Sequence, residues 1–375
     1  MSERSLTDEL TELGEALSAD HLRDDASGEF PWKKWRLLAD TGLYNLATDT
    51  ANPDGRLVET LQAMETLGYV CRDSGLSFSA ASHLASCGVS LTKFGNAALR
   101  AGYLPAIRTG DRIGAHAITE PEVGSEALAM GTTAVRDGDT FVLNGRKAFV
   151  SNGPIADQIV IYARTGPAGT AASLTAFLVD RESKGLRIGP AEEKMGLRTS
   201  PLGELELVGV RVPADHVVGF VGGGFLVLHH EMAREVLAVS AVHIGEMRYR
   251  FERCLERSKQ RTQFGKPIGA FQAVSHQLVD MKIGWETARR WLYDTAARIV
   301  AGQDATAEVA ITKLVTSEAA VNTARHAVQI FGGAGYLTET GIERTVRDSL
   351  AATIYSGTSE IQKNRVATLM GVPVE

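Results

Sequence analysis

The sequence predicts an α+β protein with helices at both ends and an antiparallel β unit between them. Two observations lead to this prediction. Apolar residues recur at helical spacing in the first 112 or so residues and after residue 222, whereas the spacing drops toward two in between. A chain of 375 residues is also long enough for two or three domains. We therefore expect domains over residues 1–113, 114–221 and 222–375.

The N-terminal domain is predicted to be helical. In the stretch LVETLQAMETLGYVC, five apolar residues recur at three- and four-residue steps, as on one face of a helix: Leu57, Leu61, Met64, Leu67 and Cys71. Such a face usually packs into a core. We therefore expect these side chains to have a structural role.

From Gly114 onward, short apolar stretches are separated by glycine and proline. Phe141 and Leu143 precede Asn144–Gly145, the pair that best accommodates a two-residue hairpin turn. Further strands are predicted in DQIVIYARTG, SLTAFLVDRE and LELVGVRVP. These signals favour an antiparallel β domain with a turn at Asn144–Gly145.

Gly222–Gly223–Gly224 interrupts the chain, and long helical segments follow it. They are predicted over residues 225–260, 271–301, 305–331 and 358–370. Short connections between long helices indicate a bundle of antiparallel helices. At the start of the last helix, Thr358 is the expected N-cap and Glu360 places a negative charge in the first turn.

Composition excludes several classes of function. Apolar residues make up 44% and charged residues 22%, as in an ordinary globular protein, and the net charge of −6 does not favour nucleic-acid binding. Cys71, Cys87 and Cys254 show neither metal-ligand spacing nor a disulfide framework, which fits a reducing compartment. The start lacks a signal peptide's apolar run, and no window reaches the roughly 18 apolar residues that span a membrane. We expect a cytoplasmic protein without metal or membrane interactions.

Motifs for zinc proteases, nucleophile elbows and P-loops do not occur in this sequence. Several longer stretches are more specific when taken together. These are AITEPEVGSE (117–126), KAFVSNG (147–153), KMGLR (194–198), RTQFGKPIGAFQ (261–272), QIFGGAGY (329–336) and IYSGTSEIQ (354–362). In this order they resemble the acyl-CoA dehydrogenase family, from about residue 30 onward. The resemblance implies a helical domain, a middle antiparallel β-barrel domain and a C-terminal four-helix bundle.

The resemblance also implies an FAD site without a Rossmann turn. On the β domain, the positions that match the family's flavin-binding segments are His116, Ile118, Thr119, Ser125, Phe149 and Ser151. Phe149 stands where the family usually has tryptophan, so ring stacking is retained while an indole N–H is lost. Glu126 replaces the usual aspartate, a change that we expect a loop to tolerate.

A second set of positions matches segments that reach the ADP half of FAD or the helix that meets the cofactor: Arg261, Gln263, Phe264, Gln272, Gln329, Gly332, Gly333, Thr358 and Glu360. In the family, the segments around Arg261 and Gln329 come from a neighbouring subunit. The resemblance therefore implies a homotetramer, built as a dimer of dimers. An arginine beside a pyrophosphate makes a charge-assisted contact. Taken alone, Arg261 would be read as a solvated helix end, but together with the other motifs it is expected to contact the cofactor.

The family reaction needs a carboxylate base, because a proton leaves the carbon next to a thioester carbonyl while a hydride leaves the next carbon for flavin N5. Many members have a glutamate where Ser356 stands here. A serine without an adjacent histidine is too weak a base for this step. Isovaleryl-type and long-chain-type members take the carboxylate from the first long helix of the bundle, and that position falls on Glu235 without a gap.

The surroundings of Glu235 fit this assignment. Apolar residues lie seven and three positions before it and four and seven after it, on one helical stripe: Leu228, Met232, Val239 and Val242. A carboxylate there would lose hydration, which raises its pKa and its strength as a base. The alternative is a surface glutamate in a helix ion pair worth at most about 0.5 kcal/mol. Those family members have arginine directly after the glutamate, whereas here Val236 follows Glu235 and Arg234 precedes it. The sequence therefore does not determine which charged groups surround the Glu235 carboxylate.

The expected activity is FAD-dependent α,β-dehydrogenation of an acyl thioester carried by CoA or by a carrier protein. The expected electron acceptor is an electron-transfer flavoprotein. One alternative is a flavin-dependent monooxygenase or nitrososynthase on the same fold, which would not need Glu235. Another is a non-catalytic assembly subunit, against which the intact FAD segments argue. The length and branching of the acyl chain depend on which side chains line the cavity between the β domain and the bundle, and no single motif encodes them.

Overall fold

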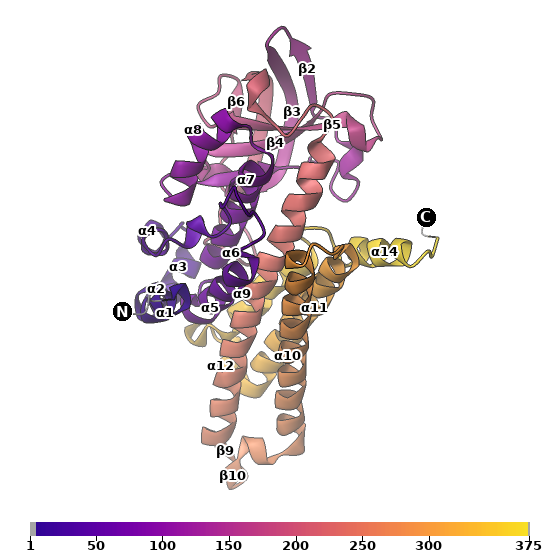
Figure 1. Cartoon of the computed structure of the whole chain (residues 1–375). Coiled ribbons are helices and arrows are strands. Elements are labelled where there is room, and N and C mark those ends of the chain that lie inside the picture. The colour runs from indigo at the N-terminus through magenta and orange to yellow at the C-terminus, as the bar shows by residue number, and fades with distance from the viewer. Residues whose placement is uncertain (1–4, 374–375) are drawn as a thin grey trace.

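The computed structural model describes residues 5–373. Helices form the first part of the chain, strands the middle and helices the last part, as predicted (Figure 1). The N-terminal helices are α1 (Leu6–Glu12), α2 (Gly14–Ser18), α3 (His21–Ser27), α4 (Trp32–Asp40), α5 (Leu57–Cys71), α6 (Ser74–His83), α7 (Ser90–Phe94) and α8 (Ala97–Arg108). A π-helical stretch, Leu84–Val89, joins α6 to α7.

Helix α5 buries the apolar face that the sequence predicts, since all five of its predicted core residues are buried. It packs against α9 (Gly224–Gln260), the longest helix of the chain. At Gly245 of α9, an added Cβ would lie 2.0 Å from the carbonyl oxygen of Glu65 on α5. Only glycine allows the two backbones to approach this closely. The contact fixes α9 against the N-terminal domain.

The middle domain is one eight-stranded sheet in the order β6-β7-β3-β2-β4-β5-β8, with β1 paired to β4. Its strands are β1 (Gly114–Ala117), β2 (Thr133–Asp137), β3 (Thr140–Ser151), β4 (Gln158–Arg164), β5 (Leu174–Asp180), β6 (Leu186–Ile188), β7 (Leu202–Pro213) and β8 (Val217–Val218). Most pairs are antiparallel, as predicted, but β1 and β2 run parallel to β4. Alternating hydrophobicity predicts strands and does not specify which neighbours are parallel.

The predicted hairpin turn at Asn144–Gly145 is wrong. Strand β3 runs through both residues, and the turn between β2 and β3 lies earlier, at Gly138, which has φ 60°. At Gly145 the register against β7 shifts, and a Cβ there would lie 2.3 Å from the hydroxyl oxygen of Thr132. The glycine therefore serves a close approach in a bulged strand.

The four predicted C-terminal helices correspond to α9, α10 (Gln272–Val300), α11 (Thr306–Phe331) and α14 (Ser359–Leu369). Thr358 caps α14 as predicted, since its hydroxyl oxygen accepts from the N–H of Ile361 at 3.3 Å. Helices α12 (Gly333–Tyr336) and α13 (Ile342–Leu350) were not predicted; most buried residues of α13 are polar, which hides its helical period. A hairpin of β9 (Thr262–Gln263) and β10 (Lys266–Pro267) joins α9 to α10.

Figure 1 shows the β domain beside one end of α9 and the β9–β10 hairpin at the other end. Helices α10 and α11 pack against α9 and against each other to form the bundle. Over residues 5–373, no helix combines the length and the apolar character needed to cross a bilayer. The part of α9 near the β domain is where the candidate site lies.

Candidate active site

Helix α9 carries two buried carboxylates one turn apart. Glu231 is fully buried and Glu235 is 3% exposed, so the predicted burial of Glu235 is confirmed. The apolar stripe around Glu235 also exists: Met232 is half-buried, and the other three predicted members are buried, namely Leu228, Val239 and Val242. Residues four positions apart on a helix share a face, so both carboxylates point to the same side of α9.

Strand β1 brings His116 to these two glutamates. The alanines on either side of it point into the core of the β domain, so the imidazole points the other way, toward α9. His116 Nδ1 contacts Oε1 of Glu231, and its Nε2 lies 3.7 Å from Oε1 of Glu235. The Tyr162 hydroxyl, on β4, donates to Oε2 of Glu231 at 2.9 Å. Both oxygens of Glu231 therefore have a partner.

Ser356, in the loop before α14, contacts the second oxygen of Glu235. Its hydroxyl donates to Glu235 Oε2 at 3.1 Å. The residue has φ 51°, and two side chains hold this loop in place. The amide of Gln362 donates to the carbonyl oxygen of Ser356 at 2.9 Å, and the Lys313 ammonium donates to that of Gly357 at 2.6 Å. Ser356 is thus a hydrogen-bond donor to Glu235.

The electrostatics of the cluster follow from its burial. Burial raises the pKa of Glu235, and the charge of Glu231 adds to this, while His116 and Ser356 lower it. Burial alone would lower the pKa of His116, but the carboxylates of Glu231 and Glu235 raise it to about 9. Burial and the charge of Glu231 raise the pKa of Tyr162 well above its usual value, so Tyr162 stays a neutral donor.

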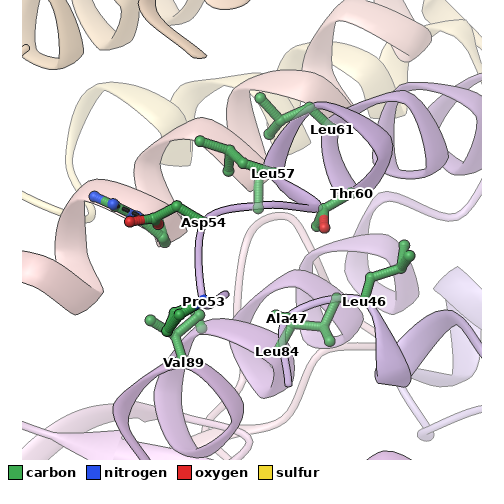
Figure 2. A pocket seen from close by; sticks show the side chains of 12 residues that line it. Leu46, Ala47, Pro53, Asp54, Leu57, Thr60, Leu61, Leu84 and Val89 are labelled. Atoms are coloured by element: carbon green, nitrogen blue, oxygen red, sulfur yellow. Dashed lines mark hydrogen bonds and ion pairs between the residues drawn. The ribbon is translucent and has the colours of Figure 1, made fainter. Parts of the chain in front are cut away.

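Arg234 faces a different side of α9. Its Nε and Nη2 donate to Oδ1 of Asp54 at 3.0 and 2.6 Å. Both residues line a small pocket of about 30 Å³, whose other lining is mostly apolar (Figure 2): Leu46, Ala47, Pro53, Leu57, Thr60, Leu61, Leu84, Ala85, Val89 and Ala238. That volume holds a water molecule or two and no acyl chain. The cation beside Glu235 is therefore His116, and Arg234 is neutralised by Asp54.

The positions of the β domain that the resemblance assigns to the flavin lie on neighbouring segments. The N–H of Ala148 donates to the carbonyl oxygen of Thr119 at 2.9 Å, which places the segment after β1 beside β3. Phe149 follows; it has φ 55° and is 66% exposed. Ser125 is exposed, and the others are half-buried: Ile118, Thr119 and Ser151. An outward-facing ring beside hydroxyl groups fits the face and polar edge of an isoalloxazine.

Several residues of the site were not singled out from the sequence. Two of them are Glu231 and Tyr162. Two more, Lys147 and Glu120, form a buried ion pair. The Lys147 ammonium donates to Glu120 Oε1 and to the carbonyl oxygen of Ile118, both at 2.9 Å. Glu120 also accepts from the N–H groups of residues 131 and 132. Lys147 and Glu120 both belong to the quoted motifs, which was a usable signal; Glu231 and Tyr162 had none.

The second set of predicted FAD positions lies at the opposite end of the bundle. Its members there are all exposed: Arg261, Gln263, Phe264, Gln272, Gln329, Gly332 and Gly333. Helix α9 has 37 residues and is about 55 Å long, so one chain does not bring this set to Phe149. Thr358 and Glu360 lie instead at the start of α14, close in sequence to Ser356.

Comparisons with known proteins agree with this architecture. The chain matches the N-terminal, middle and C-terminal domain families of acyl-CoA dehydrogenase over residues 2–111, 115–210 and 222–371. An L-prolyl-[peptidyl-carrier protein] dehydrogenase from Serratia sp. (strain ATCC 39006) is 38% identical over 84% of this chain and 82% of its own length. A short-chain-specific acyl-CoA dehydrogenase from Clostridium acetobutylicum is 32% identical over 90% of this chain and 89% of its own length.

Two solved structures share the whole fold. The prolyl acyl carrier protein oxidase AnaB superposes with a TM-score of 0.94 at 34% identity, covering 98% of both chains. PigA with FAD and proline superposes with a TM-score of 0.93 at 33% identity, covering 99% of this chain and 100% of PigA. The protein thus belongs to the acyl-CoA dehydrogenase family, whose FAD-dependent oxidoreductases act on the CH–CH bonds of acyl thioesters.

Proposed function

We propose that Glu235 is the general base of this dehydrogenase and that its acyl substrate is attached to a peptidyl-carrier protein. The observation that carries the first part is the buried carboxylate of Glu235, which accepts from Ser356 and lies beside His116. A carboxylate removed from water is a stronger base toward a weak carbon acid. Glu231 is the other acid of the cluster, and both of its oxygens are occupied by His116 and Tyr162.

In this proposal, Glu235 takes the proton from the α-carbon of the thioester. The electron pair of that C–H bond forms the α,β double bond as a hydride leaves the β-carbon. FAD, when bound, supplies the acceptor for this hydride. Ser356 orients the carboxylate through its hydrogen bond. Thr119 and Ser151 would satisfy the polar edge of the flavin, and Phe149 would cover one ring face.

The carrier and the acyl group are proposed from the relatives. Two of them, 38% and 37% identical, are L-prolyl-[peptidyl-carrier protein] dehydrogenases. L-Proline is therefore the first acyl group to test. CoA thioesters are the alternative, since relatives at 32% and 35% identity are short-chain acyl-CoA dehydrogenases.

We further propose that a second copy of the chain completes the FAD site, in a dimer that assembles into a tetramer. The exposed positions around Arg261 and Phe264 are too far from Phe149 of the same chain to hold one FAD. A neighbouring copy would supply them, with Arg261 near the pyrophosphate. An electron-transfer flavoprotein is the proposed acceptor of the electrons from the reduced flavin. The alternative acceptor is molecular oxygen, and oxygen uptake measured with and without the flavoprotein would distinguish the two acceptors.

The test is anaerobic mixing of the yellow protein with L-prolyl-carrier protein, L-prolyl-CoA and butyryl-CoA, followed by flavin absorbance. The wild type should bleach with its substrate, whereas Glu235→Gln should keep FAD and stay yellow. Glu256→Gln is the matched control, because Glu256 is an exposed glutamate on the same helix. Normal bleaching by Glu235→Gln would remove Glu235 from the role. Faster bleaching by CoA thioesters than by the carrier-protein thioester would contradict the proposed carrier.

A further inference from the structure

We propose that His116 and Glu231 are positioning residues for the base: Glu231 holds the imidazole of His116 in place and His116 provides the positive charge that keeps Glu235 available as a carboxylate. This inference rests on the proposed role of Glu235. Three elements that are distant in sequence bring the groups together, since β1 supplies His116, β4 supplies Tyr162 and α9 supplies both glutamates.

The geometry gives each group a defined part. One ligand-type atom from each of His116, Glu231 and Glu235 lies within 4.8 Å of the others. Because a carboxylate oxygen of Glu231 can only accept, its contact with Nδ1 places a hydrogen on that nitrogen. The other ring nitrogen, Nε2, then faces Glu235. Tyr162 occupies the second oxygen of Glu231, so this carboxylate is held at both ends.

The positive charge of His116 allows Glu231 and Glu235 to be ionised at the same time. Two ionised carboxylates that share one buried face repel each other, and without a counter-charge one of them takes up a proton. With a protonated His116 the cluster carries one net negative charge, and transfer of the α-proton to Glu235 brings it to zero. The imidazolium therefore opposes the burial and the like charge that raise the pKa of Glu235.

The other groups that face this cluster are neutral. Burial raises the pKa of Cys87, on the π-helical stretch, to about 12, and burial keeps the pKa values of Tyr162 and Tyr355 well above the usual value. Ser356 contributes only a hydroxyl. The guanidinium of Arg234 is bound to Asp54 on another side of α9. His116 is thus the cation among the described groups that face Glu235.

The first experiment compares the pH dependence of anaerobic flavin reduction in the wild type, His116→Gln and the double variant His116→Gln/Glu231→Gln. In His116→Gln, the acid limb should move upward by at least about one pH unit, so the rate below it falls about tenfold and recovers at higher pH. The double variant should recover most of this loss, because only one carboxylate remains. Glu256→Gln is the control. A wild-type profile in His116→Gln, or a double variant no better than the single one, would overturn the proposal.

The second measurement does not depend on turnover. ¹³C NMR of histidine labelled at Cε1 should show that the pKa of His116 falls by at least about one unit in Glu231→Gln, since its main counter-charge is gone. If the pKa of His116 is the same in Glu231→Gln as in the wild type, the proposal is wrong. This measurement does not need the His116→Gln variant, so it remains decisive if that variant fails to fold. If Glu235 is not the base, Glu235→Gln will bleach normally. This result is separate from the pKa of His116, so the role of Glu235 and the roles of His116 and Glu231 are tested independently.

Discussion

The hydroxyl of Ser356 donates to Oε2 of Glu235 at 3.1 Å, which joins the loop before α14 to the middle of the site. Many family members have a glutamate at the position of Ser356, and this chain has its buried carboxylate on α9 instead. The two positions face each other directly. We propose that Glu235 takes the role of the glutamate that those members have at this position, and that Ser356 donates a hydrogen bond to it.

Removal of this donor should weaken catalysis without removing the cofactor. Ser356 lowers the pKa of Glu235, so Ser356→Ala should move the acid limb of flavin reduction upward and slow the reaction about three- to tenfold, as for one hydrogen bond. Ser356→Asn is the control, since asparagine keeps a donor and tolerates the left-handed backbone at φ 51°. Equal rates for Ser356→Ala and the wild type would show that this hydrogen bond has no part in the reaction.

The base should also be movable across this contact. In the double variant Glu235→Gln/Ser356→Glu, the new carboxylate extends from the residue whose hydroxyl oxygen lies 3.1 Å from Oε2 of Glu235. We expect part of the anaerobic bleaching lost in Glu235→Gln to return. The measurement is the rate of flavin reduction at matched FAD content. If the double variant binds FAD and stays as inactive as Glu235→Gln, the two positions do not approach the same carbon.

The proposed second copy predicts complementation between two inactive variants. Glu235→Gln lacks the base and keeps an intact bundle tip, whereas Arg261→Ala/Phe264→Ala keeps the base and lacks the exposed tip side chains. Co-expressed chains should regain activity, because one of the two sites in a mixed pair combines an intact base with an intact tip. Activity no greater than the sum of the separate variants would indicate that each chain binds FAD alone.

Acid should destabilise the protein through His83, which contacts the first residue of β1. His83 Nδ1 accepts from the N–H of Gly114 at 2.9 Å, and Nε2 lies 3.0 Å from the carbonyl oxygen of Ile107, so the neutral ring is the one that fits. Burial lowers its pKa to about 4, from about 6.5 when unfolded. Its contribution to stability is complete above pH 6.5 and is lost progressively as the pH falls from 6.5 to about 4.

This loss amounts to about 3 kcal/mol in the free energy of unfolding between pH 6.5 and 4. Urea unfolding at several pH values measures it. His83→Gln, which keeps a donor and an acceptor but does not titrate, should lose correspondingly less over the same range. Parallel curves for the two proteins would mean that other groups cause the acid sensitivity.

Much of the fold could be predicted because helical and strand periods are local properties of the sequence. The long helices, the buried face of α5 and the cap at Thr358 followed from such patterns. Asn144–Gly145 misled, because a bulge and a turn share the same local signal. Helix α13 was missed because its buried side is polar.

The sequence predicted a residue of the site only where its role could be inferred from its immediate neighbours in the chain. Glu235 lies on an apolar stripe that can be counted along the chain. Glu231 is 115 residues from His116, and Tyr162 is 69 residues from Glu231, so their contacts depend on how β1, β4 and α9 pack. The resemblance assigned His116 to the flavin. Its side chain lies against the two glutamates, and a flavin contact at this position stays a prediction.

In the proposed reaction Glu235 moves the α-proton, and hydrogen exchange at the α-carbon measures this step without any flavin chemistry. The thioester is incubated anaerobically in D₂O with protein whose flavin has been reduced beforehand, so that no net oxidation occurs. The wild type and Glu256→Gln should introduce deuterium at the α-carbon, and Glu235→Gln should introduce none above the rate without protein. Exchange by Glu235→Gln at the wild-type rate would show that another group moves the α-proton.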